Sequence, residues 1–400
     1  MQRTKALYSF DFLAVCLVIF LTYCNITVFY NLYPYLEQIG IARQWRGFLI
    51  GSSALSTIVF FLVASPFLTT KNASRWAAVG AVVLIGCGVS YLGIRSVPGL
   101  LAVRLAHGVA IYLLSAACMT MMVAGIPAER SGQAFSLYSV ALLLPYSIVP
   151  AVCDAVVPFL PSAAYGYMDM SLLLVPGLLL IGLLSRRMRT GAAGASKPGA
   201  AISLPDMYRN AATPPVALVL LLNTLYIVTF SSLFFLAKGL FLSRGYSTVG
   251  YYFSIQMCCM IVVRLFGNRL FDQVRKVRLI RISFALSAVS FFLAARADSL
   301  LGLYGSSLAM GVGMGLGSPA LYGLMFSISS PRFKTLNSNL MMLSLQLGNF
   351  FGPLLGTWIM HSTGYGGFLL ADAGVSLLGF LLCSVLTSRR VDRQGLAAAA

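Results

Sequence analysis

The chain has 400 residues, of which 59% are hydrophobic and only 10% are charged. Because an ordinary soluble domain has about 25% charged residues, this composition excludes a soluble enzyme and a disordered chain. The 28 Lys and Arg residues outnumber the 10 Asp and Glu residues and give a net charge of +18, which in a soluble protein would suggest nucleic acid or another acidic partner.

Twelve apolar segments follow one another along the chain. A helix needs about 20 mostly apolar residues to cross the hydrocarbon core, and only short polar stretches interrupt these runs. In chain order the segments are 11–36, 46–70, 75–95, 98–125, 131–159, 166–186, 214–242, 247–270, 277–296, 299–327, 332–362 and 365–388. The first is too long for a cleaved signal peptide and lacks a small-residue cleavage site. We therefore expect an all-α membrane protein with twelve transmembrane helices.

The basic residues are unequally distributed over the two sides of these segments. With the N-terminus in the cytoplasm, 21 of the 28 Lys and Arg residues lie in cytoplasmic loops or at cytoplasmic helix ends, as the positive-inside rule requires. The positive charge is therefore a topology signal, and we expect both termini in the cytoplasm and no nucleic-acid partner. The compact chain with short loops favours a bacterial inner membrane.

One long polar stretch divides the segments into two sets of six. It is rich in Gly, Ala, Ser and Pro, a composition typical of a flexible linker. We predict an N-terminal half over 1–186, a cytoplasmic linker over 187–213, a C-terminal half over 214–393 and a disordered tail over 394–400.

Cysteine and histidine indicate neither a metal site nor a cofactor. The eight cysteines lie in apolar runs without metal-ligand or disulfide spacing. The two histidines, His107 and His361, are too few and too far apart for a metal. We interpret them as packing or interfacial residues, of which His107 is the better candidate for a titrating group.

The two halves resemble each other at a constant spacing of 203 residues. At this spacing identical residues align, among them Tyr23 with Tyr226, Gly47 with Gly250, Gly108 with Gly311 and Pro150 with Pro353. This single spacing aligns the first, second, fourth and fifth segments with their counterparts in the C-terminal half. Two parallel six-helix repeats are one of the arrangements that secondary transporters use.

The loop between the eighth and ninth segments carries a charged motif. Asp272 lies in it, and Arg264, Arg269 and Arg275 surround it in the sequence. An acid and several guanidinium groups can pair across helix ends in one conformation and separate in another. The motif therefore predicts an ionic latch.

These features resemble the major facilitator superfamily over nearly the whole chain. The resemblance rests on the motif at 264–278, on Arg104 to Gly108 in the fourth segment and on Gly348 to Gly356 in the eleventh. It implies the fold of that family, with two parallel six-helix repeats and alternating access, and the motifs are closest to those of proton-linked bacterial efflux members. Thr69 stands where the family usually has an acid between the second and third segments.

Arg104 lies about five residues inside the fourth segment, where a charge is costly and marks a functional site. In the family this signature is often linked to proton coupling. Asp154, at a similar depth in the fifth segment, and Glu37, at the outer end of the first, are its possible partners. Three interpretations stay open for Arg104: a static ion pair, proton coupling, and an interfacial position of its charged end.

Gly348, Gly352 and Pro353 lie close together in the eleventh segment. Glycines four residues apart permit close helix contact, and proline removes one backbone hydrogen bond. This stretch is similar to a signature that drug antiporters of the family normally carry in the fifth segment. Packing explains it, and a hinge used in gating is the alternative.

The resemblance places the substrate site near mid-membrane between the two halves. The mid-span candidates are amides, phenols and aromatic rings, which suit a neutral or zwitterionic organic solute. They are Thr22, Asn25, Phe29, Tyr138, Tyr146, Asn223, Tyr226, Phe230, Gln256, Tyr322, Gln346 and Asn349. Each could equally make an interhelical hydrogen bond without touching the substrate.

A proton-coupled exporter of a small organic compound is the preferred interpretation, and uptake of a sugar, carboxylate or other nutrient is the alternative. A membrane enzyme would need a nucleophile with its base or paired acids, and neither is visible. A receptor that kept the fold and lost transport is a second alternative, because of Thr69. We expect a small-molecule substrate, the bilayer and protons as partners, and a monomer.

Overall fold

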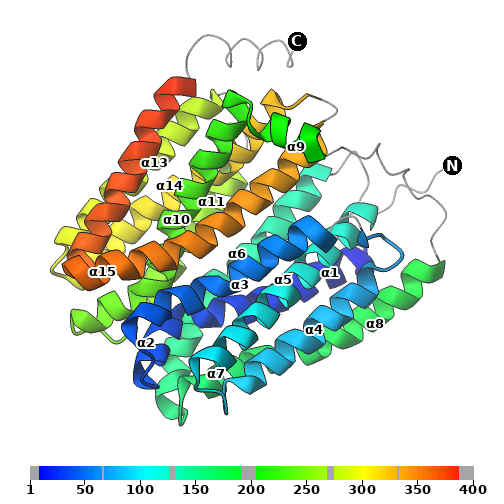
Figure 1. The fold of residues 1–400 in the computed structure, drawn as a ribbon, viewed down its shortest axis with the longest axis horizontal. Coiled ribbons are helices and arrows are strands. Elements are labelled where there is room, and N and C mark those ends of the chain that lie inside the picture. Colours follow the sequence, from blue (N-terminus) through cyan, green and yellow to red (C-terminus); the bar gives the residue numbers. More distant parts are fainter. Residues whose placement is uncertain are drawn as a thin grey trace. The chain divides into compact units, whose positions relative to one another are not determined.

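The structure, a computed structural model, describes residues 9–64, 67–125, 131–190, 204–267, 274–330 and 333–386. All regular secondary structure in these ranges is helical (Figure 1). Helices are expected for a chain in lipid, because the hydrocarbon offers no partner to a free backbone N–H or carbonyl group. The chain forms two compact units: Met1–Lys197 with Ser247–Ser254, and Pro198–Tyr246 with Ile255–Ala400.

The first unit contains the helices that precede residue 191. In chain order these are α1 (Phe10–Thr27), the 3-10 helix η1 (Val28–Asn31), α2 (Leu32–Gln38), α3 (Arg43–Ala64), α4 (Ala73–Ser90), α5 (Val97–Gly125), α6 (Ser131–Val156), the 3-10 helix η4 (Val157–Phe159), α7 (Ala163–Leu172) and α8 (Leu174–Thr190). The predicted sixth segment is thus two helices. Pro176 explains the break, because it has no N–H to donate to the carbonyl group four residues earlier.

The second unit contains the later helices. They are α9 (Leu204–Ala211), α10 (Pro214–Ser243), α11 (Gly250–Phe266), α13 (Lys276–Arg296), α14 (Leu300–Ile328) and α15 (Lys334–Leu386). The first turn of α11 belongs to the first unit. Within α15 the backbone turns at Gly364, with φ 71° and ψ −177°. Glycine takes this conformation without steric cost, so α15 is two successive helices.

Ten of the described helical stretches are long and apolar enough to cross a membrane. This number counts α15 once, and α11 is apolar but has only 17 residues. The observed ends lie within a few residues of most predicted ends. The all-helical membrane class is confirmed, and the number of twelve spans stays a prediction.

The linker expected over 187–213 is partly helical. α8 continues to Thr190, and α9 occupies Leu204–Ala211. Asn210 in α9 donates a hydrogen bond from Nδ2 to Oδ1 of Asn337 in α15, at 2.5 Å. This contact fixes α9 to α15 within the second unit.

Small residues let the helices of each unit approach closely. In the first unit, a Cβ on Gly80 of α4 would lie 3.0 Å from the carbonyl oxygen of Ala110 in α5. In the second, a Cβ on Gly352 of α15 would lie 2.7 Å from the carbonyl oxygen of Val228 in α10. Membrane helices associate through such contacts, because lipid provides no hydrophobic force between them. The glycines of the eleventh segment therefore form the α10–α15 contact.

Candidate functional site

Arg104 of α5 is buried and binds the backbone of α3. Its side chain is 3% exposed. Nε donates to the carbonyl oxygen of Leu49 at 3.1 Å, and Nη2 donates to the carbonyl oxygen of Ile50 and to Oγ of Ser53, both at 2.6 Å. The neutral acceptors of α3 therefore hold this guanidinium group inside the first unit.

A directed chain of hydrogen bonds continues from Arg104, and we call these five residues the Arg104 network. Nη1 of Arg104 lies 3.0 Å from Nδ1 of His107. A guanidinium group only donates, so Nδ1 accepts, and Nε2 of His107 carries the hydrogen that it donates to Oδ1 of Asn25 at 2.9 Å. Asn25 then donates to Oγ of Ser171 at 2.5 Å, and Ser171 donates to the carbonyl oxygen of Tyr167 at 2.6 Å. In this arrangement His107 is neutral and joins α5 to α1, and Asn25 continues the chain to Ser171 of α7.

The ring of Phe29 packs against the same network. Its centroid lies 4.6 Å from that of Tyr167 and 4.8 Å from that of His107. The Arg104 guanidinium carbon lies 5.3 Å from the Phe29 centroid, a distance typical of a cation–π contact. The structure thus brings three predicted residues together: Asn25 and Phe29 from the substrate set and Arg104 from the coupling set.

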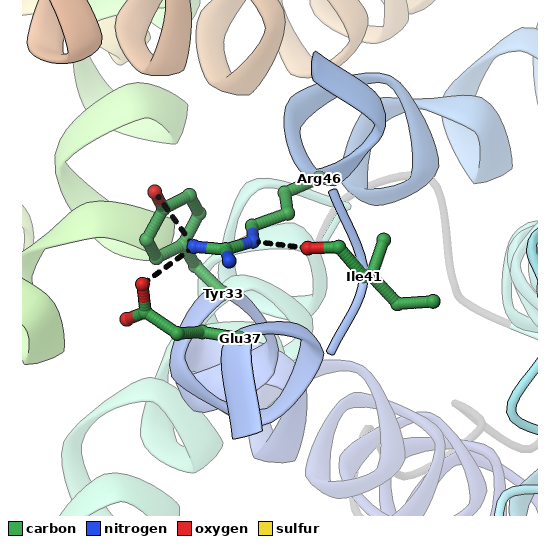
Figure 2. Close-up of polar contacts among 4 residues, drawn as sticks. All are labelled: Tyr33, Glu37, Ile41 and Arg46. Atoms are coloured by element: carbon green, nitrogen blue, oxygen red, sulfur yellow. Dashed lines mark hydrogen bonds and ion pairs between the residues drawn. The ribbon is translucent and has the colours of Figure 1, made fainter. Parts of the chain in front are cut away.

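The expected pairing of Arg104 with Glu37 or Asp154 is wrong for this structure. Among the described residues, Arg104 has no carboxylate partner. Glu37 instead accepts a hydrogen bond from Nη1 of Arg46 at 2.7 Å, and Arg46 also donates from Nε to the carbonyl oxygen of Ile41 at 2.8 Å (Figure 2). The short turn between α2 and α3 brings Glu37 and Arg46 together, so the acid is already paired at the end of α2.

Asp154 binds the beginning of α11. Its Oδ1 accepts from the hydroxyl group of Tyr30 at 2.7 Å. Its Oδ2 accepts from the backbone N–H groups of Val249 at 2.5 Å and Gly250 at 2.7 Å. N–H groups at a helix N-terminus have no partner within the helix, and a negative charge there is stabilising. Similar depth suggested that Asp154 binds Arg104, but its carboxylate points to this helix end.

The contact between α6 and the first turn of α11 is close. A Cβ on Gly250 would lie 2.3 Å from Cα of Ala151, so glycine permits the approach of the two backbones. One turn further, Oγ of Ser254 donates to the carbonyl oxygen of Ser147 at 2.6 Å. Asp154 therefore caps a helix end that packing already holds in place.

Three candidates of the second unit bind its own helices. Nδ2 of Asn223 donates to Oγ of Ser344 at 2.7 Å, and the hydroxyl group of Tyr226 donates to the carbonyl oxygen of Met314 at 2.6 Å. Gln256 is fully buried, with Nε2 3.4 Å from Sδ of Met314 and Oε1 without a hydrogen-bond partner among the described residues. Buried amide oxygens nearly always accept a hydrogen bond. Oε1 of Gln256 could therefore accept one from a water molecule or a solute.

The other substrate candidates have weaker or purely local contacts. Thr22 donates to the carbonyl oxygen of Val18 in its own helix at 2.8 Å, and Tyr138 lies in the apolar core of the first unit. The remaining contacts join Tyr146 to Tyr23, Phe230 to Phe234, Tyr322 to Met342 and Gln346 to Asn349. Contact of these residues with a substrate stays a prediction.

The predicted latch is only partly within the described chain. Asp272 and Arg269 lie outside the described residues. Arg264 is half-buried in α11, and Arg275 is exposed at the residue before α13. Pro353 lies inside α15, where its carbonyl oxygen accepts from Thr357 at 2.7 Å. The latch and the hinge stay predictions.

Asp372 is a buried acid that the sequence analysis missed. It lies in the second part of α15 and is 5% exposed. Its Oδ2 is 2.6 Å from Oγ of Ser232 in α10. The available signal was an acid seven residues inside the twelfth segment, because an ionisable group within a membrane helix is a functional candidate by default.

Comparison with known proteins identifies the family. The model of the Major Facilitator Superfamily matches residues 15–280 and 242–399. The chain belongs to this superfamily. No curated protein matches the chain. As a member of this superfamily, the protein is an integral, multi-pass membrane transporter of a small molecule and not an enzyme.

Solved structures of transporters share the fold. A nucleoside transporter, NupG, has a TM-score of 0.72 at 14% identity, over 94% of this chain and 100% of that one. A POT family transporter in complex with a thioalcohol-conjugated peptide has a TM-score of 0.77 at 12% identity, over 94% and 96%. A bacterial homologue of the human lysosomal transporter Spinster, inward-facing and unoccupied, has a TM-score of 0.71 at 15% identity, over 99% and 95%.

Replacing Asn25 tests the Arg104 network. Asn25→Ala leaves His107 and Ser171 without their partner, and we expect the free energy of unfolding to fall by about 1–3 kcal/mol. Thermal unfolding in detergent measures this loss. Thr22→Ala is the matched control, because Thr22 bonds only within α1. Equal loss in both variants would contradict the role of the network.

Replacing Asp154 tests the capping of α11. In Asp154→Asn the charge is lost, and an N–H group of the amide can face the N–H groups of Val249 and Gly250. We expect amide hydrogen exchange at these two residues to accelerate about tenfold, because charge-assisted hydrogen bonds are the stronger ones. Asp169→Asn, at an exposed position in α7, is the control. Unchanged exchange in Asp154→Asn would rule out the cap.

Proposed function

We propose that the protein is a proton-coupled secondary transporter that exports a small organic solute from a bacterial cell. In this proposal it is a monomer of the inner membrane, with twelve spans and both termini in the cytoplasm. The family supports alternating access. Asp372 is the observation that carries the coupling to protons.

The hydrogen bonds around Asp372 are compatible with its protonated form. Oγ of Ser232 lies 2.6 Å from Oδ2 of Asp372 and 3.0 Å from the carbonyl oxygen of Thr229. A hydroxyl group has one hydrogen and cannot donate to both. If Oδ2 of Asp372 is protonated and donates to Ser232, then Ser232 can donate to Thr229, and Oδ2, Oγ and the Thr229 carbonyl oxygen each take part in a hydrogen bond.

The surroundings of Asp372 make its ionised form costly. Among the described residues no charged side chain contacts it, and a carboxylate buried without a cation or several donors is strongly disfavoured. α10 and both parts of α15 pack closely here, because a Cβ on Gly356 would lie 3.0 Å from Cβ of Ser232 and 3.3 Å from the ring of Phe368. Release of the proton would therefore require these helices to separate, or water to enter between them.

The three earlier coupling candidates take different parts in this proposal. Arg104 is a fixed positive charge that joins α5 to α3. Asp154 is a carboxylate whose protonation would weaken its hold on α11, and Glu37 is paired with Arg46. Asp372 differs from them because its hydrogen-bond partner among the described residues, Ser232, is neutral and no cation compensates its charge.

Uptake of a nutrient is the second candidate function. A nucleoside transporter and a peptide-bound transporter have the same fold, and a protonatable Asp372 would serve symport as well as antiport. The resemblance of the glycine and proline stretch in α15 to that of antiporters supports export.

A proton-release assay tests the proposal. Inverted vesicles with an acid interior receive drugs, chelators, sugars and amino acids in turn, and proton release is followed. We expect a transported class to release protons in the wild type and not in Asp372→Asn, which should still exchange the solute down its gradient. Asp298→Asn, at an exposed position, is the control.

Two outcomes would contradict the proposal. Proton release by Asp372→Asn at the wild-type rate would exclude Asp372 as the carrier. Solute movement in the wild type without any proton movement would exclude coupling and indicate a facilitator.

A further inference from the structure

A cavity of about 340 Å³ lies beside the beginning of α13. α13 packs along α15 in the second unit (Figure 1). The cavity lining includes three arginines and an apolar side, namely Arg275, Arg278, Arg281, Ile282, Ala285 and Phe380. Residues three apart lie on one side of a helix, so α13 directs Arg278 and Arg281 to the same side, and Arg275 lies just before its first residue.

Two of these three arginines lack a carboxylate partner in the described part of the chain. Neither Arg278 nor Arg281 pairs with a carboxylate among the described residues, and the guanidinium carbon of Arg281 lies 5.0 Å from the ring centroid of Phe380. The neighbouring Lys276 points elsewhere, because its Nζ donates to Ser327 of α14 at 3.2 Å. Arg278 and Arg281 both line the cavity with a positive charge, so the cavity is complementary to an anion.

The position and the apolar side identify the kind of anion. α13 and α15 are both apolar enough to cross a membrane, and the cavity lies at the first turns of α13. Ile282 is 41% exposed, and Phe380 is half-exposed. A soluble phosphate would need only the arginines, whereas a phospholipid presents a phosphate next to acyl chains. Basic pockets between membrane helices are suited to anionic lipid headgroups.

We infer that this cavity binds the phosphate group of an anionic phospholipid, with Arg278 and Arg281 as its ligands and Ile282, Ala285 and Phe380 against the acyl chains. Guanidinium groups bind phosphate oxygens with two parallel hydrogen bonds. The inference does not depend on the transported solute or on proton coupling. It concerns a lipid molecule bound at one cavity of the second unit.

Native mass spectrometry of the purified full-length protein tests this site. Phosphatidylglycerol and phosphatidylcholine with identical acyl chains are the probes, and the apparent Kd of each is measured. We expect the wild type to prefer phosphatidylglycerol and the double variant Arg278→Gln with Arg281→Gln to bind it about tenfold more weakly. The double variant with lysine at both positions should keep most of the preference, because the charge remains.

Arg296→Gln is the matched control. Arg296 lies at the other end of α13, and its guanidinium carbon is also close to an aromatic ring, 5.5 Å from the centroid of Phe292. It should bind phosphatidylglycerol as the wild type does. If the double variant fails to fold, Arg278→Gln alone, at an exposed position, decides the question.

Three results would overturn the inference. The first is unchanged phosphatidylglycerol binding in the folded arginine variants, and the second is equal binding of the two lipids by the wild type. The third is displacement of the lipid by millimolar inorganic phosphate, which would show that the arginines bind a soluble anion.

Discussion

A polar side chain inside a membrane must find its hydrogen-bond partners within the chain, because the hydrocarbon provides none. This constraint places Arg104. Its guanidinium group is held by carbonyl oxygens of α3 and by His107, and the need of His107 for a second partner orients Asn25 and then Ser171. The positions of α1, α3, α5 and α7 relative to one another therefore depend on a single buried cation.

The two units satisfy this constraint in different ways. In the Arg104 network each polar atom has a neutral partner, and the charge sits on arginine, which stays protonated at any physiological pH. In the second unit Asp372 is a buried acid, and its hydrogen-bond partner among the described residues is one hydroxyl group. A carboxyl group can change its charge, and arginine cannot. The first unit is thus suited to hold a fixed geometry, and in the proposed function the second unit contains the group that binds the proton.

The sequence predicts the helices well, because length and apolar composition decide whether a segment crosses lipid. The parallel repeats and the motifs also predicted the family, and the match to the family model confirms it. Side-chain pairing was predicted poorly, as Arg104 and Asp154 show: similar depth does not fix the side of the helix on which a residue lies. Pro176 was a visible signal for the division of the sixth segment into two helices. The helix α9 inside the polar stretch had no local signal, because its contact is with Asn337, a residue more than a hundred positions away.

The central claim, that Asp372 holds a proton in this conformation, is tested most directly by infrared spectroscopy of the protein in lipid at neutral pH. A protonated carboxyl group has a carbonyl stretching band that a carboxylate lacks. We predict that Asp372→Asn loses one such band and that Ser232→Ala shifts it, because a hydrogen bond to the group is removed. Identical carboxyl bands in the wild type and Asp372→Asn would contradict the account, because Asp372 would then be charged.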